Sequence, residues 1–213
     1  IRQATAPMTF DEYASLYFSQ HRIDQLWGWW MLRETNPPLF YTLLKVWRMM
    51  VPDSQPALRL LPMLLSLAQI ALVARFARQR YGVFSAAVAV LLFALSPSDI
   101  FQSEDVRGYV LCKLAVTVSF IGLVGALEGE GRRARQWALY VGGAVVAIYS
   151  HTTLLLWTPV ATLAAFAEAA IARKIDRRRL VALVAADCAI AALSTWAVWF
   201  AVEQLRSGAP DLL

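Results

Sequence analysis

Long stretches without a charged side chain are the feature that most constrains the fold of this chain. The residues within 60–74, 83–98, 114–127, 136–167 and 188–202 include no Asp, Glu, Lys or Arg. Hydrophobic residues make up 59% of the chain and charged residues 16%, against roughly 45–50% and about 25% in a soluble domain. One buried core cannot hold that excess, whereas each crossing of a bilayer needs roughly 20 apolar helical residues. The chain is therefore predicted to be all-α, a polytopic transmembrane helical bundle.

The apolar stretches predict six transmembrane helices within residues 58–203. We expect them near residues 58–76, 83–98, 109–127, 136–150, 152–171 and 180–203. The fourth and fifth are so close in sequence that their connection near 149–153 must be tight, and both crossings must be short or locally bent. Residues 1–57 then form a first extracytoplasmic loop with juxtamembrane helices, and residues 204–213 begin a further one. The start at Ile1 and the end just after a crossing predict a chain truncated at both ends.

The basic residues give the expected orientation. Short cytoplasmic loops are enriched in Lys and Arg, and three connections hold 11 of the 20 such residues. These are Arg75, Arg78 and Arg80; Arg132, Arg133 and Arg135; and Arg173, Lys174, Arg177, Arg178 and Arg179. Six crossings place all three connections on one side, and the acidic loop 98–108 on the other. The net charge of +5 is thus a topology signal, and no nucleic-acid partner is expected.

Three residues inside the predicted helices have ordinary explanations. Cys112 and Cys188 are small thiols in apolar surroundings, and they predict neither a disulfide nor a metal site. Asp187 lies roughly 10 Å from the basic end of its helix by helical rise. An ionisable group at that depth is often functional, but this one is on the basic side, so we interpret it as a helix-packing hydrogen bond or a pair with a neighbouring Arg.

The exported segment predicts short helices at the membrane surface. Residues 1–57 contain four tryptophans, which favour the boundary between membrane and water. The Pro37-Pro38 pair stops one helix and permits the next to start. The stretch Leu39–Val51 is too short to cross a bilayer and carries Lys45 and Arg48, so we expect an interfacial helix. Such helices should pack over the outer ends of the bundle.

Four polar clusters are predicted to meet at that outer face. They are Asp11-Glu12, Glu34-Thr35-Asn36-Pro37-Pro38, Ser103-Glu104-Asp105-Val106-Arg107-Gly108-Tyr109 and Ser150-His151. Carboxylates, an Arg and a His at the mouth of a bundle suit acid–base chemistry on a phosphorylated lipid. Each cluster also has an ordinary interpretation. Loop carboxylates are often solvated, Arg107 could pair with Glu104 or Asp105, a His beside a turn often bonds within the turn, and Lys113 could snorkel outward.

The order of these clusters resembles the GT-C type of polyprenyl-phosphate-sugar glycosyltransferase, the group that includes protein O-mannosyltransferases and lipid A aminoarabinose transferases. The similar run is Asp11-Glu12, Asn36-Pro37-Pro38-Leu39-Phe40-Tyr41, Ala57-Leu58-Arg59-Leu60-Leu61-Pro62, Tyr81-Gly82, Leu95-Ser96-Pro97, Gln102-Ser103-Glu104-Asp105-Val106-Arg107-Gly108-Tyr109 and Tyr149-Ser150-His151. It spans about residues 9–160. The order and spacing are more specific than any one motif.

The resemblance implies transfer of a sugar from a polyprenyl phosphate to an acceptor hydroxyl, with inversion, at the extracytoplasmic face of a bacterial inner membrane. The acceptor would be a lipid, a glycan or a protein. By resemblance, Asp11 is the general base, with a pKa raised by partial burial, and Glu12 positions the acceptor or the base. Arg107 holds the donor phosphate, with help from Lys113. Asn36, Glu104, Asp105, Tyr109 and His151 are supporting residues, and Glu104, Asp105 and His151 are possible ligands of a divalent metal.

Two positions depart from the family pattern. Relatives usually carry His or Lys where Asn36 stands, and an amide supplies neither positive charge nor a proton. Asp105 stands where a small residue is common, which leaves Glu104 and Arg107 aligned but changes the charge between them. A catalytically inactive relative and a membrane transporter therefore remain alternatives. These motifs do not encode the sugar, the acceptor, metal dependence, oligomeric state or the activity of a truncated chain.

Overall fold

The computed structural model describes residues 6–129, 133–171 and 177–206 of the chain, and all regular secondary structure within them is helical. The α-helices are α1 (Phe10–Gln20), α2 (Ile23–Leu26), α3 (Leu39–Arg48), α4 (Gln55–Leu95), α5 (Pro97–Glu104), α6 (Tyr109–Glu128), α7 (Arg133–Ser150), α8 (Trp157–Ile171), α9 (Arg177–Leu193) and α10 (Thr195–Arg206), with 3-10 helices η1 (Trp29–Arg33) and η2 (Thr152–Leu156). The expected all-α fold is confirmed. Arg132, Arg173, Lys174 and residues 207–213 lie outside the described residues.

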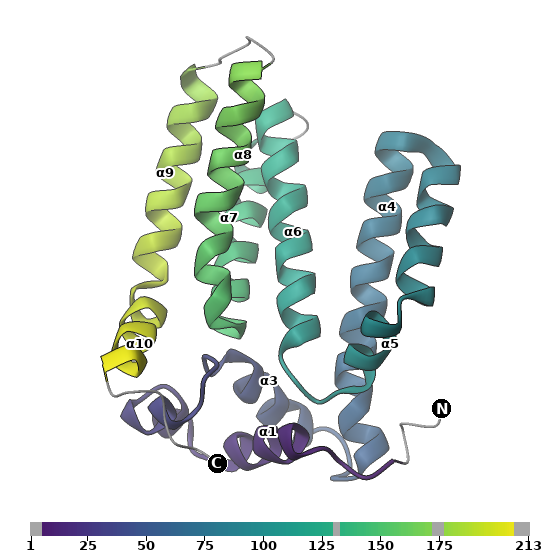
Figure 1. Ribbon diagram of the computed structural model, residues 1–213, viewed down its shortest axis with the longest axis vertical. Helices are drawn as coiled ribbons and strands as arrows, with labels where there is room; N and C mark the ends of the chain where they lie inside the picture. Colours follow the sequence, from purple (N-terminus) through teal and green to yellow (C-terminus); the bar gives the residue numbers. More distant parts are fainter. Residues whose placement is uncertain (1–5, 130–132, 172–176, 207–213) are drawn as a thin grey trace.

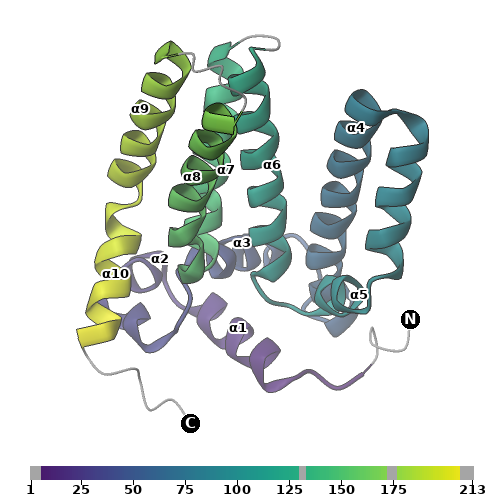
Figure 2. The same ribbon diagram turned by 45° about the horizontal axis from the view of Figure 1, so that its top comes forward.

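The helices form two layers of different orientation. Helices α6 to α9 run side by side along the long axis, with α4 beside them, and the short helices α1 to α3 lie across one end (Figure 1). The turned view shows the same arrangement, with α10 at that end as well (Figure 2). The described parts of the Arg-rich connections, which are the turn within α4 and the amino-terminal ends of α7 and α9, lie at the other end, which we call the basic end (Figure 1). Helices α1 to α3 thus pack over the opposite end of the bundle, as expected for the exported segment.

The long helix α4 contains a sharp break at Gly82. This residue has φ 90° and ψ 178°, a conformation that costs little only for glycine. The chain folds back there, so α4 consists of two arms, residues 55–81 and 83–95, that run in opposite directions (Figure 1). The first two predicted crossings correspond to these arms.

The other predicted crossings also fall on helices, and the sequence did not indicate the bend in the sixth. The third corresponds to α6 and the fourth lies within α7, while the fifth is divided between η2 and α8. The sixth is bent by 59° between α9 and α10. By length and composition, α4 and α6 are each able to cross a membrane, and α9 with α10 adds a third if the bent pair is one span. The number six remains a prediction.

Small residues bring α6 and α7 into close contact. A Cβ atom added to Gly143 would lie 2.6 Å from the backbone nitrogen of Ser119, and one added to Gly122 would lie 2.4 Å from that of Tyr140. The Ser119 hydroxyl donates to the Tyr140 carbonyl at 3.0 Å and accepts from Trp157 of α8 at 2.9 Å. Close backbone approach with interhelical hydrogen bonds is the usual way in which membrane helices associate.

We predict that Gly143→Ala destabilises the bundle by about 1–3 kcal/mol, because the added methyl group meets backbone atoms that cannot move aside alone. The neighbouring Gly142 is the control, since a Cβ there meets nothing within 4 Å. Gly142→Ala should leave stability unchanged or raise it by up to about 1 kcal/mol through helix propensity. Unfolding in detergent micelles, followed by circular dichroism, measures both. Equal effects of the two changes would contradict the proposed contact.

Asp187 joins three helices. Its Oδ1 accepts a hydrogen bond from the Tyr140 hydroxyl of α7 at 2.7 Å, and its Oδ2 accepts one from Thr162 of α8 at 2.5 Å. Both carboxylate oxygens are therefore used between helices, as a polar group inside an apolar bundle requires. The interpretation of Asp187 as a helix-packing residue is confirmed.

The short helices at the end opposite the basic end have an apolar core of their own. Leu26, Met31, Phe40 and Leu44 are almost completely buried there, together with Phe200 of α10. Helix α3 begins directly after the Pro37-Pro38 pair and ends at Arg48, slightly earlier than expected. Its two basic residues do not face only water. Lys45 donates to the Ser19 and Gln20 carbonyls in the carboxyl-terminal turn of α1, which satisfies carbonyls that the end of a helix leaves free. Arg48 donates to the Ser19 hydroxyl.

Candidate functional site

Glu12 is the best-connected carboxylate of the chain's described part. Its side chain reaches back to the Thr9 backbone nitrogen at 2.9 Å and closes a capping box at the start of α1. Arg59, in the first turns of α4, donates two hydrogen bonds to it at 2.9 and 2.8 Å, and the Val106 backbone nitrogen donates a third at 3.3 Å. Glu12 is 1% exposed and Arg59 is 4% exposed. One carboxylate thus connects α1, α4 and the loop before α6.

These donors decide the charge of Glu12. Burial alone would raise its pKa, but the hydrogen bonds from Arg59, Thr9 and Val106 and the charge of Arg59 lower the pKa below its usual value. An ionised carboxylate whose oxygens already accept four hydrogen bonds has little capacity to take a proton from a substrate. Glu12 is therefore suited to positioning its neighbour Asp11, the second of the roles expected for it.

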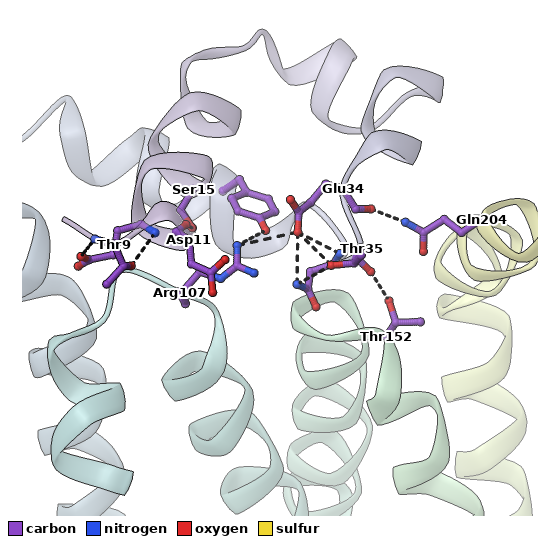
Figure 3. A network of polar contacts seen from close by, with 11 residues as sticks. Thr9, Asp11, Ser15, Glu34, Thr35, Arg107, Thr152 and Gln204 are labelled. Carbon is purple, nitrogen blue, oxygen red and sulfur yellow. Dashed lines mark hydrogen bonds and ion pairs between the residues drawn. The ribbon is translucent and has the colours of Figure 1, made fainter. Parts of the chain in front are cut away.

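Asp11 is in a different environment from Glu12. Its side chain is exposed, and its carboxylate makes no hydrogen bond to another described residue, although its backbone carbonyl accepts one from Ser15 at 3.1 Å. Figure 3 shows Asp11 between α1 and Arg107. The expected partial burial of Asp11 was wrong, because it occupies the open face of the first turn of α1. The carboxylate is accessible to an incoming hydroxyl.

Arg107 is a buried guanidinium without a close partner. It is 8% exposed, and its Nη1 lies 3.5 Å from the Tyr41 hydroxyl and 3.9 Å from Glu34 Oε1. Its Cζ lies 6.0 Å from the Tyr109 ring centroid. Hydrogen bonds between a guanidinium and a carboxylate are usually about 2.7–2.9 Å long. Burial alone would lower the pKa of Arg107, but the acidic groups around it raise the pKa. The charge stays, and much of its donor capacity is unused.

Glu34, rather than Glu104 or Asp105, is the carboxylate nearest to this guanidinium. It is 7% exposed, and its Oε1 accepts from Asn36 Nδ2 at 3.3 Å and from the Thr35 hydroxyl at 3.3 Å. Figure 3 shows Glu34 at the centre of these contacts. Asn36 thus donates its amide to Glu34 and helps to hold the carboxylate against Arg107. The sequence placed Glu34 in a polar cluster but assigned it no role.

The segment that carries Glu34 and Thr35 is fixed by hydrogen bonds from two helices. The Thr152 hydroxyl of η2 donates to the Thr35 carbonyl at 3.0 Å, and Gln204 of α10 donates to the Glu34 carbonyl (Figure 3). Trp196 of α10 contacts Trp27 and stacks on Tyr149. The loop that carries Glu34 and Asn36 is therefore held by helices from the far end of the chain.

A small cavity lies beside Arg107. Its volume is about 10 Å³, which is room for about one water molecule. The lining residues are Asn36, Pro37, Phe40, Tyr41, Arg107, Gly108, Tyr109, Ser150 and His151. The structure thus brings Asn36, Arg107, Tyr109 and His151 together, as expected. A phosphate enters this cavity only when the lining side chains move apart.

Two titratable side chains that line this cavity, Tyr41 and His151, are neutral. Burial raises the pKa of the Tyr41 hydroxyl well above its usual value, so it remains a phenol and can donate. Burial and the charge of Arg107 lower the pKa of His151. His151 also accepts a hydrogen bond from the Thr153 backbone nitrogen through Nδ1, at 3.4 Å, and caps η2. The interpretation of His151 as a hydrogen-bonded turn residue is confirmed.

Asp105 faces a second cavity, of about 70 Å³. That cavity is lined by Ala6, Pro7, Thr9, Glu12, Arg59, Phe101, Glu104 and Asp105. Asp105 is 8% exposed, and its Oδ1 has no hydrogen-bond partner among the residues that the structure describes. Burial and the charge of Glu12 raise the pKa of Asp105 to about 6. Asp105 is thus a buried carboxyl with a pKa close to neutrality.

Ionisation of Asp105 lowers the free energy of unfolding by an amount that depends on pH. Because its pKa is raised in the folded state, ionisation favours the unfolded chain, and this cost is complete above pH about 6 and is lost as the pH falls toward 3.8. We predict that Asp105→Asn raises the free energy of unfolding at pH 7 by roughly 2–4 kcal/mol. The advantage should fall by about half at pH 5. Denaturation in detergent at both pH values measures it, and an advantage independent of pH would contradict the assignment.

Three expected site residues, Lys113, Glu104 and Asp105, do not line the cavity beside Arg107. The Lys113 ammonium pairs with Asp99 of α5, with Nζ 2.5 Å from Oδ1, and Lys113 does not line the cavity of Arg107. A role in phosphate binding requires that pair to break. Glu104 and Asp105 line one cavity and His151 lines the other. Across residues 6–129, 133–171 and 177–206, no three His, Cys, Asp or Glu side chains are placed to hold one metal ion.

Comparison with protein-family models, with curated proteins and with solved structures finds no match for this chain. The likeness to GT-C glycosyltransferases therefore depends on the quoted motifs alone. A functional assignment must depend on the geometry and chemistry of the site.

Proposed function

We propose that the protein is a membrane glycosyltransferase that moves a sugar from a polyprenyl-phosphate donor to an acceptor hydroxyl. One observation carries the proposal. Arg107, a buried guanidinium with only long contacts, lies near the accessible carboxylate of Asp11 (Figure 3). Both lie at the end of the bundle opposite the basic end. By the charge rule for loops, that end faces outward from the cytoplasm, which in a bacterial inner membrane is the periplasmic side.

The proposed reaction assigns one task to each group. The acceptor hydroxyl oxygen attacks the anomeric carbon, and its proton passes to Asp11. The bond between the anomeric carbon and the phosphate oxygen breaks, its electrons remain on that oxygen, and polyprenyl phosphate leaves. Arg107 stabilises the negative charge that grows on the phosphate, assisted by the neutral Tyr41 hydroxyl. Attack opposite to the leaving group inverts the anomeric centre. Glu34 and Asn36 hold Arg107 in place.

Transfer of a labelled sugar tests the role of Arg107. In membranes that contain the full-length protein and a radiolabelled pool of polyprenyl-phosphate sugars, Arg107→Ala should reduce transfer by about 10²–10³-fold, the usual effect of removing one group that stabilises a developing charge. Arg22→Ala is the matched control, because this Arg lies at the same end of the molecule and its side chain is 80% exposed. Undiminished transfer by Arg107→Ala, at an equal protein level, would refute the assignment.

A lipid-binding relative without catalysis is the second candidate. Its support is the size of the cavity beside Arg107, about 10 Å³, together with the amide at Asn36. The same assay separates the two functions. A wild-type protein that transfers none of several polyprenyl-linked sugars, but still binds polyprenyl phosphate through Arg107, would establish the second.

A further inference from the structure

A large groove lies at the other end of the molecule, between the two arms of α4. Its volume is about 1050 Å³, at the upper end of the roughly 300–1,000 Å³ of small-molecule sites. It is lined by Ala74, Arg75, Arg78, Gln79, Val83, Ala86, Ala87, Val90 and Leu91. The break at Gly82 brings these residues together, since the first four belong to one arm and the rest to the other. The turn between the two arms lies at the basic end (Figure 1).

The described residues do not neutralise the cations of the groove. Arg75 and Arg78 are exposed, and neither forms an ion pair or hydrogen bond with another residue in the described part of the chain. The nearby Arg80 differs, because it pairs with Glu128 at the end of α6 and lies over the Phe76 ring at 5.5 Å. The structure thus pairs one arginine of this connection internally and leaves two at the groove.

The second arm gives the groove an apolar wall. Val83 is 67% exposed and Leu91 is 57% exposed, and Val90 lies between them in the lining. The two arms are antiparallel about Gly82, so Arg75 and Arg78 on the first arm lie at about the same depth as residues 86–90 on the second. The groove therefore has a cationic side and an apolar side that face each other. An inorganic anion would use only the cations. A hydrocarbon chain would use only the wall.

We propose that this groove binds an anionic phospholipid from the leaflet on the basic side. The headgroup phosphate lies between Arg75 and Arg78, and one acyl chain lies against Val90 and Leu91 on the facing arm and continues away from the basic end. Arginines near the membrane surface attract anionic lipids at about 1 kcal/mol each, and burial of the chain adds the apolar contribution. The site is far from Asp11 and Arg107 and does not depend on the proposed sugar transfer.

Native mass spectrometry of the detergent-purified full-length chain tests the site. Phosphatidylglycerol and phosphatidylcholine with the same acyl chains serve as probes, and the wild type should retain the anionic lipid with a preference of roughly tenfold or more. Arg75→Gln combined with Arg78→Gln should abolish the preference. Arg135→Gln is the matched control, since Arg135 is exposed at the same end, on α7, outside the groove. Val90→Trp fills the groove and should reduce lipid retention without a change of charge.

Three outcomes would overturn the proposal. Equal retention of the two lipids removes the role of the arginines. An equal loss of preference in Arg135→Gln shows that the whole basic end, and not the groove, attracts the lipid. Displacement of phosphatidylglycerol by millimolar inorganic phosphate, with Val90→Trp unchanged, identifies a free-anion site that does not use the apolar wall. Circular dichroism of each variant confirms that the helices are intact.

Discussion

Asp11→Asn should lower sugar transfer by roughly 10²–10⁴-fold, the range that general-base catalysis contributes. The amide has nearly the same shape as the carboxylate, but it cannot take the proton of the acceptor hydroxyl. Asp11 is exposed and its carboxylate has no hydrogen bond to another described residue, so the change should leave the fold intact. Donor binding should also persist, because Arg107 is unchanged. A loss of turnover without a loss of donor affinity is the specific result.

The control for Asp11 is Asp24→Asn. Asp24 lies in the same polar segment, is 65% exposed and pairs only with the exposed Arg22, so transfer should be unaffected. If Asp11→Asn keeps full activity while Asp105→Asn loses it, the general base is Asp105, the buried carboxyl with the raised pKa. Asp105 then takes the place of Asp11 in the proposed mechanism. If both variants keep full activity, neither carboxyl is the base.

Glu12→Gln should destabilise the protein by about 3–5 kcal/mol, the usual cost of leaving one partner of a buried ion pair alone. Arg59 is 4% exposed and would keep its charge in a poorly solvated position. Replacing both partners, Glu12→Gln with Arg59→Met, should recover most of the loss, because the arginine charge is removed together with its counter-ion. Unfolding in detergent micelles measures all three proteins.

An exposed ion pair provides the comparison. Asp53→Asn breaks the pair of Asp53 with Arg48, in which the aspartate side chain is 60% exposed, and should cost about 0–1 kcal/mol. If Glu12→Gln costs no more than Asp53→Asn, the Glu12–Arg59 pair is not the connection between α1 and α4 that the structure indicates.

The sequence predicted those features of the fold that depend on local composition. Stretches without charge locate the long helices, and the Pro37-Pro38 pair locates the start of α3, because both depend on neighbouring residues. The location of Asp187 on the basic side favoured a packing hydrogen bond or a pair with an Arg, and the packing bonds are the ones present. The reversal of α4 at Gly82 matches the predicted connection between the first two crossings. The 59° bend between α9 and α10 was missed, since hydropathy does not report backbone torsion angles.

The sequence predicted which residues gather at the site but not which of them contact one another. Adjacent residues on a helix differ by about 100° in direction, so Asp11 and Glu12 lie in opposite environments although they read as one pair. The sequence suggested Glu104 or Asp105, from the same loop, as a partner of Arg107. The carboxylate nearest to Arg107 is instead that of Glu34, from a distant segment. Lys113 likewise pairs with Asp99 across a turn. Such partners depend on which segments meet, and no single motif contains that information.

The bonds of Glu12 also set the geometry of the proposed reaction. Asp11 precedes Glu12 by one peptide unit, and Arg107 follows Val106, whose backbone nitrogen donates to the same Glu12 carboxylate. The proton acceptor and the phosphate-binding cation are therefore each one residue away from a single buried ion. These bonds fix the distance between Asp11 and Arg107, and α1 cannot move away from the loop without separating Glu12 from its partners. In the proposed reaction, donor and acceptor have to fit this distance, so the site would select substrates by length before any side chain recognises the sugar.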